Sequence, residues 1–227
     1  KDLRPVVVVS AMGKTTDKLL EMARQAAAGA RQQALELLLE LEQFHLREGG
    51  SVNGRIEQLF GELGELIRGL AILGELTPRS IDAVSSYGER LSSLIVAEAF
   101  RQAGLDAECV DARQLIITDE RHTEAVPLFD ETYRRIQSQV APLVQAGKIV
   151  VMGGFIASSR RGVTTTLGRG GSDFTAAIVG AALGAEEVQI WTDVDGLMTT
   201  DPSLVPRARR IKIISFEEAA ELAYFGA

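Results

Sequence analysis

Short β-branched segments alternate with longer helical segments along most of this chain. The run Val-Val-Val-Val at residues 6–9 is typical of a strand buried on both faces, and a polar turn follows it. Such alternation implies a parallel or mixed sheet with helices on both faces. In open sheets of this kind, ligands bind beyond the carboxyl ends of the strands. The sequence therefore predicts an α/β fold with its functional residues in the turns that follow strands.

The periodicity also gives the approximate bounds of each element. Strands are expected at residues 6–9, 107–110, 115–118, 148–152 and 188–192. Helices are expected from about residue 16, and over 31–48, 55–73, 81–103, 131–146, 172–183 and 216–224. We expect the first helix to be capped by Thr15, Thr16 or Asp17, which are residue types favoured at that position.

Composition excludes several classes of protein. The 227 residues suffice for one large domain or two small ones, and the net charge of −7 argues against a nucleic-acid surface. No apolar run reaches membrane-spanning length and no signal-peptide pattern opens the chain, so a cytoplasmic location is expected. The single cysteine, Cys109, cannot form an internal disulfide. His45 and His122 lack the spacing of zinc ligands.

The segment Thr-Thr-Thr-Leu-Gly-Arg-Gly-Gly-Ser-Asp at residues 164–173 has the composition of an anion site. Its glycines let backbone N–H groups approach a ligand closely, and it leads into a helix whose N-terminus favours negative charge. The flat fork of Arg169 suits two-point binding of a carboxylate or phosphate. A surface loop that ends in an Asp173 N-cap is the alternative, but the density of donors favours phosphate or carboxylate binding.

Three further segments carry candidate residues. Ser10, Gly13 and Thr16 lie between the first strand and its helix, where they would suit an anion or simply cap the helix. Glu89 lies where a helical turn begins, and it could anchor an ammonium group or be an ordinary first-turn glutamate. The segment 188–196 ends in two aspartates and a glycine, which fits a plain turn or a nucleotide contact.

Three familiar nucleotide- and metal-binding motifs are absent. The turn after residues 6–9 resembles the end of a P-loop, but Val8 stands where the first glycine is required. A dinucleotide fingerprint that begins at Gly168 fails because Asp173 stands where its last glycine is required. An EF-hand frame around Gly196 would begin at Trp191 and end at Pro202, where the motif requires acidic calcium ligands.

The candidate segments together resemble the catalytic domain of aspartate kinases, in the amino acid kinase family. The resemblance spans nearly the whole chain in the family's order. Its matching stretches are Val-Val-Ser-Ala-Met-Gly at 8–13, Ser-Tyr-Gly-Glu-Arg-Leu-Ser at 86–92, Gly-Phe-Ile-Ala at 154–157, the 164–173 segment, Ile-Trp-Thr-Asp-Val-Asp-Gly-Leu-Met-Thr-Thr-Asp-Pro at 190–202, and Glu-Ala-Ala-Glu-Leu-Ala-Tyr-Phe-Gly at 218–226.

This resemblance implies a three-layer αβα sandwich with a mainly parallel central sheet. It also implies transfer of the γ-phosphoryl group of ATP to the side-chain carboxylate of L-aspartate, which gives 4-phospho-L-aspartate, the entry step to lysine, threonine and methionine. The cofactors would be ATP and Mg²⁺, with no nucleic-acid or membrane partner. Because the acceptor carboxylate is already ionised near neutral pH, no general base is required.

The resemblance assigns roles residue by residue. Glu89 would hold the substrate ammonium and Arg169 its α-carboxylate. Asp173 would be the catalytic aspartate, which we interpret as an organiser of a lysine or Mg²⁺ rather than a proton acceptor. Ser10, Thr16, Phe155 and Ser172 would line the same substrate pocket. The nucleotide would contact Gly13, Gly170, Gly171, Thr192, Asp193, Met198 and Ser203.

The resemblance also implies a division of the chain. We expect residues 1–227 to form one truncated catalytic domain, with an amino-acid-binding lobe over about 1–172 and part of the nucleotide-binding lobe over about 173–227. The family's Lys-Phe-Gly-Gly-Thr-Ser strand, its Lys-Val-Leu-His-Pro segment and its ACT domains are not in this sequence, and Ser203 stands where some members have arginine. Without two phosphate-facing lysines the 227-residue chain should be nearly inactive, although the parent protein would be a homo-oligomeric aspartate kinase.

Two alternatives stay open at this point. The same fold could act on acetylglutamate, glutamate or a nucleotide, although Glu89 together with Arg169 favours a free α-amino acid. The chain could also be a ligand-binding module of this fold without catalytic activity.

Overall fold

The structure is a computed structural model that describes residues 4–192, 196–201 and 204–224. The chain divides into two compact units, Lys1–Val188 and Gln189–Ala227. The first unit contains both sheets and helices α1 to α8, and the second contains helix α9 (Phe216–Tyr224). The predicted lobe boundary near residue 172 lies inside α8 (Gly171–Leu183), which belongs to the first unit.

Two small sheets lie at the centre of the first unit. The first has the order β1-β4-β2 and is parallel throughout, with Val6 opposite Val150 and Ala107 opposite Ile149. In the second, β3 runs parallel to β5, and β6 is antiparallel to β5. The strands are β1 (Val6–Val9), β2 (Ala107–Val110), β3 (Ile117–Thr118), β4 (Ile149–Gly153), β5 (Ile156–Ser159) and β6 (Thr164–Thr166).

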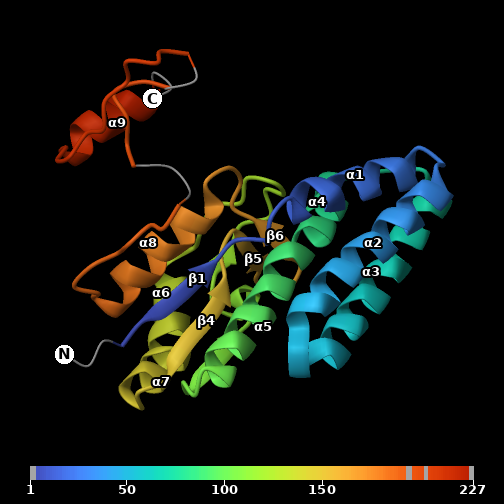
Figure 1. Cartoon of the computed structure of the whole chain (residues 1–227), viewed down its shortest axis with the longest axis horizontal. Helices are drawn as coiled ribbons and strands as arrows, with labels where there is room; N and C mark the ends of the chain where they lie inside the picture. Colours follow the sequence, from blue (N-terminus) through green and yellow to red (C-terminus); the bar gives the residue numbers. More distant parts are fainter. Residues whose placement is uncertain (1–3, 193–195, 202–203, 225–227) are drawn as a thin grey trace. The chain divides into compact units, whose positions relative to one another are not determined.

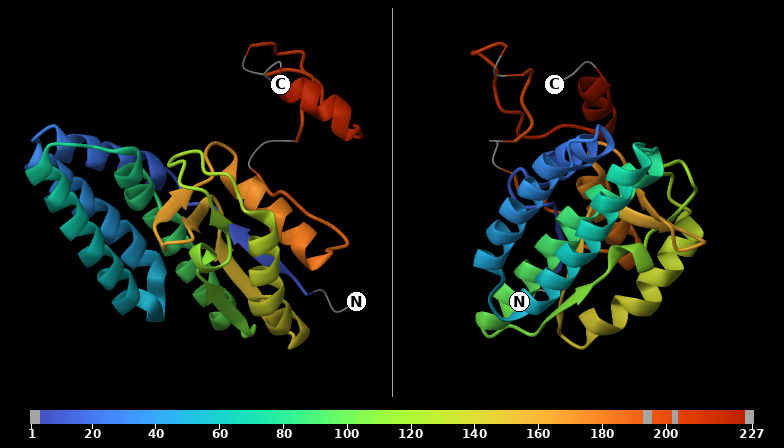
Figure 2. Two further views of the ribbon diagram at one scale, coloured as in Figure 1. Left: turned by 180° about the vertical axis from the view of Figure 1, so that it is seen from behind. Right: turned by 90° about the vertical axis from the view of Figure 1, so that its right-hand side faces the viewer.

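Helices cover both faces of the parallel sheet, which confirms the predicted three-layer αβα arrangement. Helix α5 (Tyr87–Gln102) packs on all three of its strands from one side. Helices α7 (Ala141–Gln145) and α8 pack on β4 and β1 from the other side, where α6 (Phe129–Gln139) packs on α8. Figure 1 shows α5 in front of the strands, and Figure 2 shows α6 and α8 in front when the molecule is seen from behind.

Four helices form a bundle on the outer side of α5. These are α1 (Thr15–Ala27), α2 (Arg31–Gly49), α3 (Asn53–Leu73) and α4 (Pro78–Ser85). Helices α2 and α3 lie side by side (Figure 1), joined by the short helix η1 (Gly50–Val52). Buried leucines and isoleucines such as Leu19, Leu41, Ile56, Leu63 and Leu91 fill the space between these helices and α5. A second core, which includes Val150, Met152, Ile136 and Ile178, lies between the sheet and α6 and α8.

Several predicted elements differ in the structure. β1 is half-buried, not buried on both faces, because it is an edge strand and β4 takes the central position. The predicted strand at 115–118 shrinks to Ile117–Thr118, after the short helix η2 (Ala112–Gln114). The predicted helix 81–103 is two helices that meet at Ser86, and 131–146 is divided at Val140.

The predicted buried strand at 188–192 is also absent. Residues 188–192 have no regular structure, and Val188, Ile190 and Trp191 are 47%, 50% and 88% exposed. A strand needs a neighbour to satisfy its backbone groups, and no strand of the described residues pairs with this segment.

The second unit is held by local interactions. Met198 and Arg210 form an isolated antiparallel bridge. Ser215 and Glu218 form a capping box at the start of α9, because the Ser215 hydroxyl accepts from the Glu218 N–H and the Glu218 carboxylate accepts from the Ser215 N–H, at 3.2 and 3.0 Å. Among the residues that the structure describes, no helix is both long and apolar enough to cross a membrane.

Candidate active site

A hollow of about 330 Å³ opens where two strands end and three helices begin. This volume is in the range of small-molecule sites, roughly 300–1,000 Å³. Ser10 follows β1, Thr16 lies in the first turn of α1, and Glu89 lies in the first turn of α5. The complete lining is Ser10, Thr16, Glu89, Phe155, Gly168, Arg169, Gly170, Gly171, Ser172 and Asp173. The seven residues predicted for the substrate and the catalytic step thus border one space.

Glu89 presents a buried carboxylate to this hollow. The residue is 3% exposed, and its Oε1 accepts a hydrogen bond from the Ala11 N–H at 3.2 Å. Its Oε2 is buried without a partner among the described residues. Burial raises the pKa of Glu89 from 4.5 to about 7, although hydrogen bonds from its own N–H and that of Ala11 lower it. A buried carboxylate with one free oxygen is suited to a cationic ligand.

Two glycines allow the strand ends to come this close to the helices. A Cβ at Gly153 would lie 2.8 Å from the Glu89 Cβ and 3.2 Å from its carbonyl oxygen. A Cβ at Gly154 would lie 2.6 Å from the Ser172 Cα. Any side chain at either position would therefore push α5 or α8 away from the end of β4.

Arg169 lies in the loop between β6 and α8, with its side chain exposed. In the described part of the chain, no carboxylate or carbonyl pairs with its guanidinium. Gly170 has a φ of 71°, a left-handed conformation that glycine adopts readily, and it precedes the first turn of α8. Ser172 and Asp173 are the second and third residues of that helix, so Asp173 is not its N-cap. The helix N-terminus and Arg169 together favour an anion here.

Phe155 has an unusual backbone conformation at the edge of the hollow. Its φ is 62°, which is rare for an aromatic residue. Its N–H donates to the hydroxyl of buried Thr175 at 3.1 Å, and that hydroxyl donates to the Gly171 carbonyl at 2.8 Å. Thr175 therefore ties the turn after β4 to the first turn of α8.

The three threonines of the 164–173 segment have partners within the protein. Thr165 and Thr166 are buried, and their hydroxyls bond the Thr118 hydroxyl and the Asp82 carboxylate. Thr164 accepts from Arg113 at 3.4 Å. These side chains fix β6 instead of binding an anion, because each hydroxyl already has a partner within the protein.

The start of α1 also differs from the prediction that Thr15, Thr16 or Asp17 caps it. The N-cap is Lys14, and no side chain caps the helix. The Thr15 hydroxyl donates to the Met12 carbonyl at 2.6 Å. This leaves Thr16, which lines the hollow, as the hydroxyl of that turn available to a ligand.

The predicted nucleotide-binding residues are spread over both units. Gly170 and Gly171 line the hollow, whereas Gly13 lies in the α1 turn without lining it. Thr192 is exposed and Met198 half-buried in the second unit. Asp193 and Ser203 lie outside the described residues.

Sequence reasoning missed the Ala11 N–H and Gly168 as parts of this site. A backbone donor carries no residue-type signal, and Gly168 was considered only as one of the glycines of the 164–173 segment and as the start of a failed dinucleotide motif. Asp173 is the one carboxylate at the exposed rim of the hollow, and in the described residues no group of three or more histidines, cysteines, aspartates or glutamates could hold a metal by itself.

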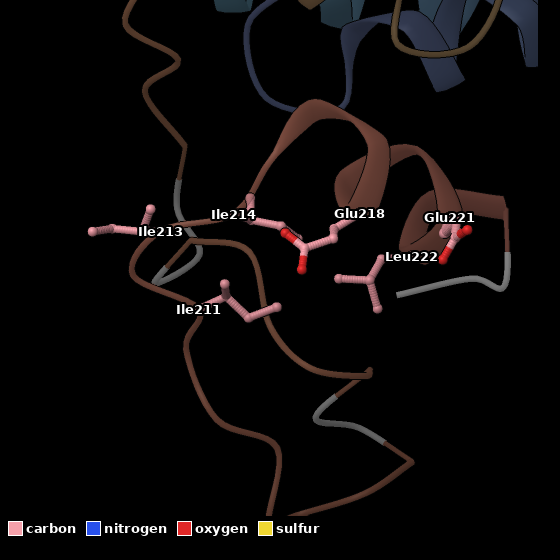
Figure 3. Close-up of a pocket in the computed structure, with 6 residues that line it drawn as sticks. All are labelled: Ile211, Ile213, Ile214, Glu218, Glu221 and Leu222. Atoms are coloured by element: carbon pink, nitrogen blue, oxygen red, sulfur yellow. The ribbon is translucent and has the colours of Figure 1, made fainter.

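A second hollow lies within the C-terminal unit. Figure 3 shows it between the segment that carries Ile211 and Ile214 and the helix that carries Glu218 and Leu222. Its lining is apolar apart from Glu218 and Glu221, and it contains none of the predicted site residues. The first hollow is therefore the candidate active site.

Known proteins resemble this chain over its whole length. Residues 1–227 match the family model described as the amino acid kinase family. Chloroplastic aspartokinase 2 of Arabidopsis thaliana is 38% identical over all of this chain and 43% of its own length. Lysine-sensitive aspartokinase 3 of Escherichia coli is 38% identical over 98% of this chain and 49% of its own length.

Solved aspartokinase structures also match the fold of this chain. The fold matches E. coli aspartokinase III in complex with aspartate and ADP, in its R-state, with a TM-score of 0.90 and 36% identity over 98% of this chain and 50% of that one. The T-state complex of that protein with lysine and aspartate matches with a TM-score of 0.83, 36% identity and coverage of 97% and 49%. The chain thus spans about half the length of the relatives it matches.

Proposed function

The chain belongs to the amino acid kinase family and matches the catalytic domain of aspartokinases, and on that premise we propose that its hollow binds L-aspartate for phosphorylation by ATP. The observation that carries this proposal is that a buried carboxylate, Glu89, and the guanidinium of Arg169, which pairs with none of the described residues, line one small pocket. The phosphoryl acceptor is the side-chain carboxylate of aspartate.

The charges of the pocket complement those of aspartate. The free Oε2 of Glu89 accepts from the substrate ammonium, and this ion pair favours the ionised form of Glu89. Arg169 binds the α-carboxylate through its planar fork. The hydroxyls of Ser10, Thr16 and Ser172 supply further donors for carboxylate oxygens.

The phosphate side of the reaction lies at the N-terminus of α8. The helix dipole and the exposed backbone at Gly170 favour the negative charge of a transferring phosphoryl group, whereas the Gly171 N–H already donates to the Gly168 carbonyl at 3.1 Å. Mg²⁺ is usually held by one or two carboxylates together with substrate phosphates, and the exposed Asp173 fits that role. Bound Mg²⁺ would neutralise phosphate charge. No residue has to remove a proton, because the acceptor carboxylate is ionised near neutral pH.

The relatives support this choice of substrate. The E. coli aspartokinase III structure that this fold matches contains aspartate and ADP. At 36% identity the substrate of that protein is a strong precedent for this chain, whose pocket has the matching pair of charges.

A panel of ligands tests the proposal. We expect calorimetry to detect binding of L-aspartate and much weaker binding of L-glutamate, N-acetyl-L-glutamate and nucleoside monophosphates. The Glu89→Gln variant should bind aspartate roughly 10- to 150-fold more weakly. Hydroxylamine added with ATP and Mg²⁺ should trap any acyl phosphate as an aspartyl hydroxamate, which mass spectrometry identifies. Preferential binding of the N-acetylated ligand would contradict the proposal, because that ligand has no ammonium group for Glu89.

A further inference from the structure

Asp82 is a buried carboxylate that the reaction described above does not use. It lies on α4 and is 0% exposed. Its oxygens accept from the His122 Nδ1 at 2.6 Å, from the Thr123 N–H at 3.0 and 3.1 Å, and from the Thr166 hydroxyl at 2.6 Å. One side chain thus joins a helix, a loop and a strand that are far apart in the sequence.

The partners of Asp82 support the loop that carries Arg169. Thr166 is the last residue of β6, three positions before Arg169. Thr123 has a φ of 73°, a costly conformation for a threonine, and the Asp82 carboxylate holds its N–H. The Thr123 carbonyl packs against Gly168, where an added Cβ would lie only 3.2 Å from that oxygen. Gly168 itself has a φ of 79°.

We propose that Asp82, together with His122, is a positioning residue that holds the Arg169 loop in its ligand-binding conformation. Asp82 fixes the strand before this loop through Thr166 and the wall beneath it through Thr123. That Arg169 binds a ligand carboxylate rests on the proposed function, whereas the support that Asp82 gives to the Arg169 loop does not.

The arrangement requires a carboxylate and not merely a polar side chain. An ionised aspartate only accepts hydrogen bonds, and all three groups around Asp82 donate to it. An asparagine has no charge and one acceptor oxygen in place of two, so the charge-assisted hydrogen bonds that Asp82 receives become weaker or are lost. At position 122, asparagine can place an amide N–H₂ close to where the His122 Nδ1 lies, whereas alanine removes the donor.

The test compares Asp82→Asn, His122→Ala and His122→Asn with a matched control. Glu98→Gln alters another buried carboxylate, which bonds Ser51, Arg101 and Gln102 near the opposite end of α5 from Glu89. Two quantities are measured for each variant: hydrogen exchange of the peptide covering residues 164–171, and the Kd for L-aspartate by calorimetry. His122→Ala keeps the proposal testable if Asp82→Asn does not fold.

We expect Asp82→Asn and His122→Ala to speed exchange in residues 164–171 and to raise the Kd by about 10- to 100-fold. His122→Asn should restore most of both losses, and Glu98→Gln should change neither. Unchanged exchange in 164–171 in both Asp82→Asn and His122→Ala would overturn the proposal. If the unmodified chain does not bind aspartate but exchange responds as expected, the proposed function fails and the role of Asp82 stands.

Discussion

At the scale of single residues, Glu89 has the most demanding environment in the site. Its carboxylate is buried, one oxygen has no partner among the described residues, and burial raises its pKa to about 7. An isolated charge in such a place is unfavourable unless a partner arrives. Glu89 is therefore poorly suited to stabilising the fold and well suited to binding a cation.

The affinity for aspartate should depend on pH near neutrality. Only the ionised form of Glu89 attracts the substrate ammonium, and the pKa of Glu89 in the free protein is about 7. Below that value the Kd should rise by up to about tenfold per pH unit, because a growing fraction of Glu89 is protonated. Calorimetry between pH values of about 5 and 8 measures this slope. The same slope in Glu89→Gln would assign the titration to another group.

The same residue should lower the stability of the folded chain at higher pH. The pKa of Glu89 is raised from 4.5 to about 7 on folding, so the unfolding free energy falls as the pH increases through that window. At about pH 8, Glu89→Gln should therefore be more stable than the unmodified chain, by up to about 3 kcal/mol. Below about pH 4 the difference should vanish. Denaturant titrations at both pH values test the prediction, and a variant that is less stable at the higher pH would contradict it.

At the scale of elements, the site depends on how closely the end of β4 approaches α5 and α8. Gly153 abuts Glu89 and Gly154 abuts Ser172, so the turn after β4 sets the distance between two helix N-termini. Thr175 then joins this turn to α8 through Phe155. The pocket is thus a property of one strand–turn–strand segment and the helices beside it.

A methyl group at Gly154 should disturb this contact. Its Cβ would lie 2.6 Å from the Ser172 Cα, which is backbone and cannot move aside alone. Gly154→Ala should lower the unfolding free energy by about 1–3 kcal/mol and weaken aspartate binding. Gly61→Ala is the matched control, because Gly61 lies exposed on α3 with nothing within 4 Å of the added Cβ. That control should raise stability by up to about 1 kcal/mol.

Sequence patterns predicted elements well where the signal is local. The strand at 6–9, the helices α2 and α3 and the start of α8 follow from periodicity and turn residues. The predicted strand at 188–192 was wrong, because strand formation requires a partner that local sequence does not reveal. The break at Ser86 has no proline to mark it, and its only glycine, Gly88, lies inside the first turn of α5.

Residue types predicted where the candidate site lies, but they did not predict the directions in which its side chains point. The threonines at 164–166 looked like ligand donors, yet their hydroxyls bond Arg113, Thr118 and Asp82. Asp82 itself passed unnoticed because a lone aspartate in a helical segment carries no motif. Its importance comes from long-range contacts with residues 122, 123 and 166.

At the scale of the whole molecule, the first unit brings together segments more than 150 positions apart, from Ser10 to Asp173. This convergence follows from the parallel sheet, since the ends of β1 and β4 lie on the same edge and the helices that follow begin there. We propose that in this unit Glu89 and Arg169 bind the opposite charges of one aspartate molecule.

Titration with truncated ligands tests this claim most directly. Succinate is aspartate without its amine, and β-alanine is aspartate without its α-carboxylate. Glu89→Gln should weaken aspartate binding by about 1.5–3 kcal/mol, roughly 10- to 150-fold in Kd, and leave succinate binding nearly unchanged. Arg169→Gln should weaken aspartate binding to a similar extent and leave β-alanine binding nearly unchanged. Equal losses for aspartate and for the truncated ligand in both variants would contradict the account.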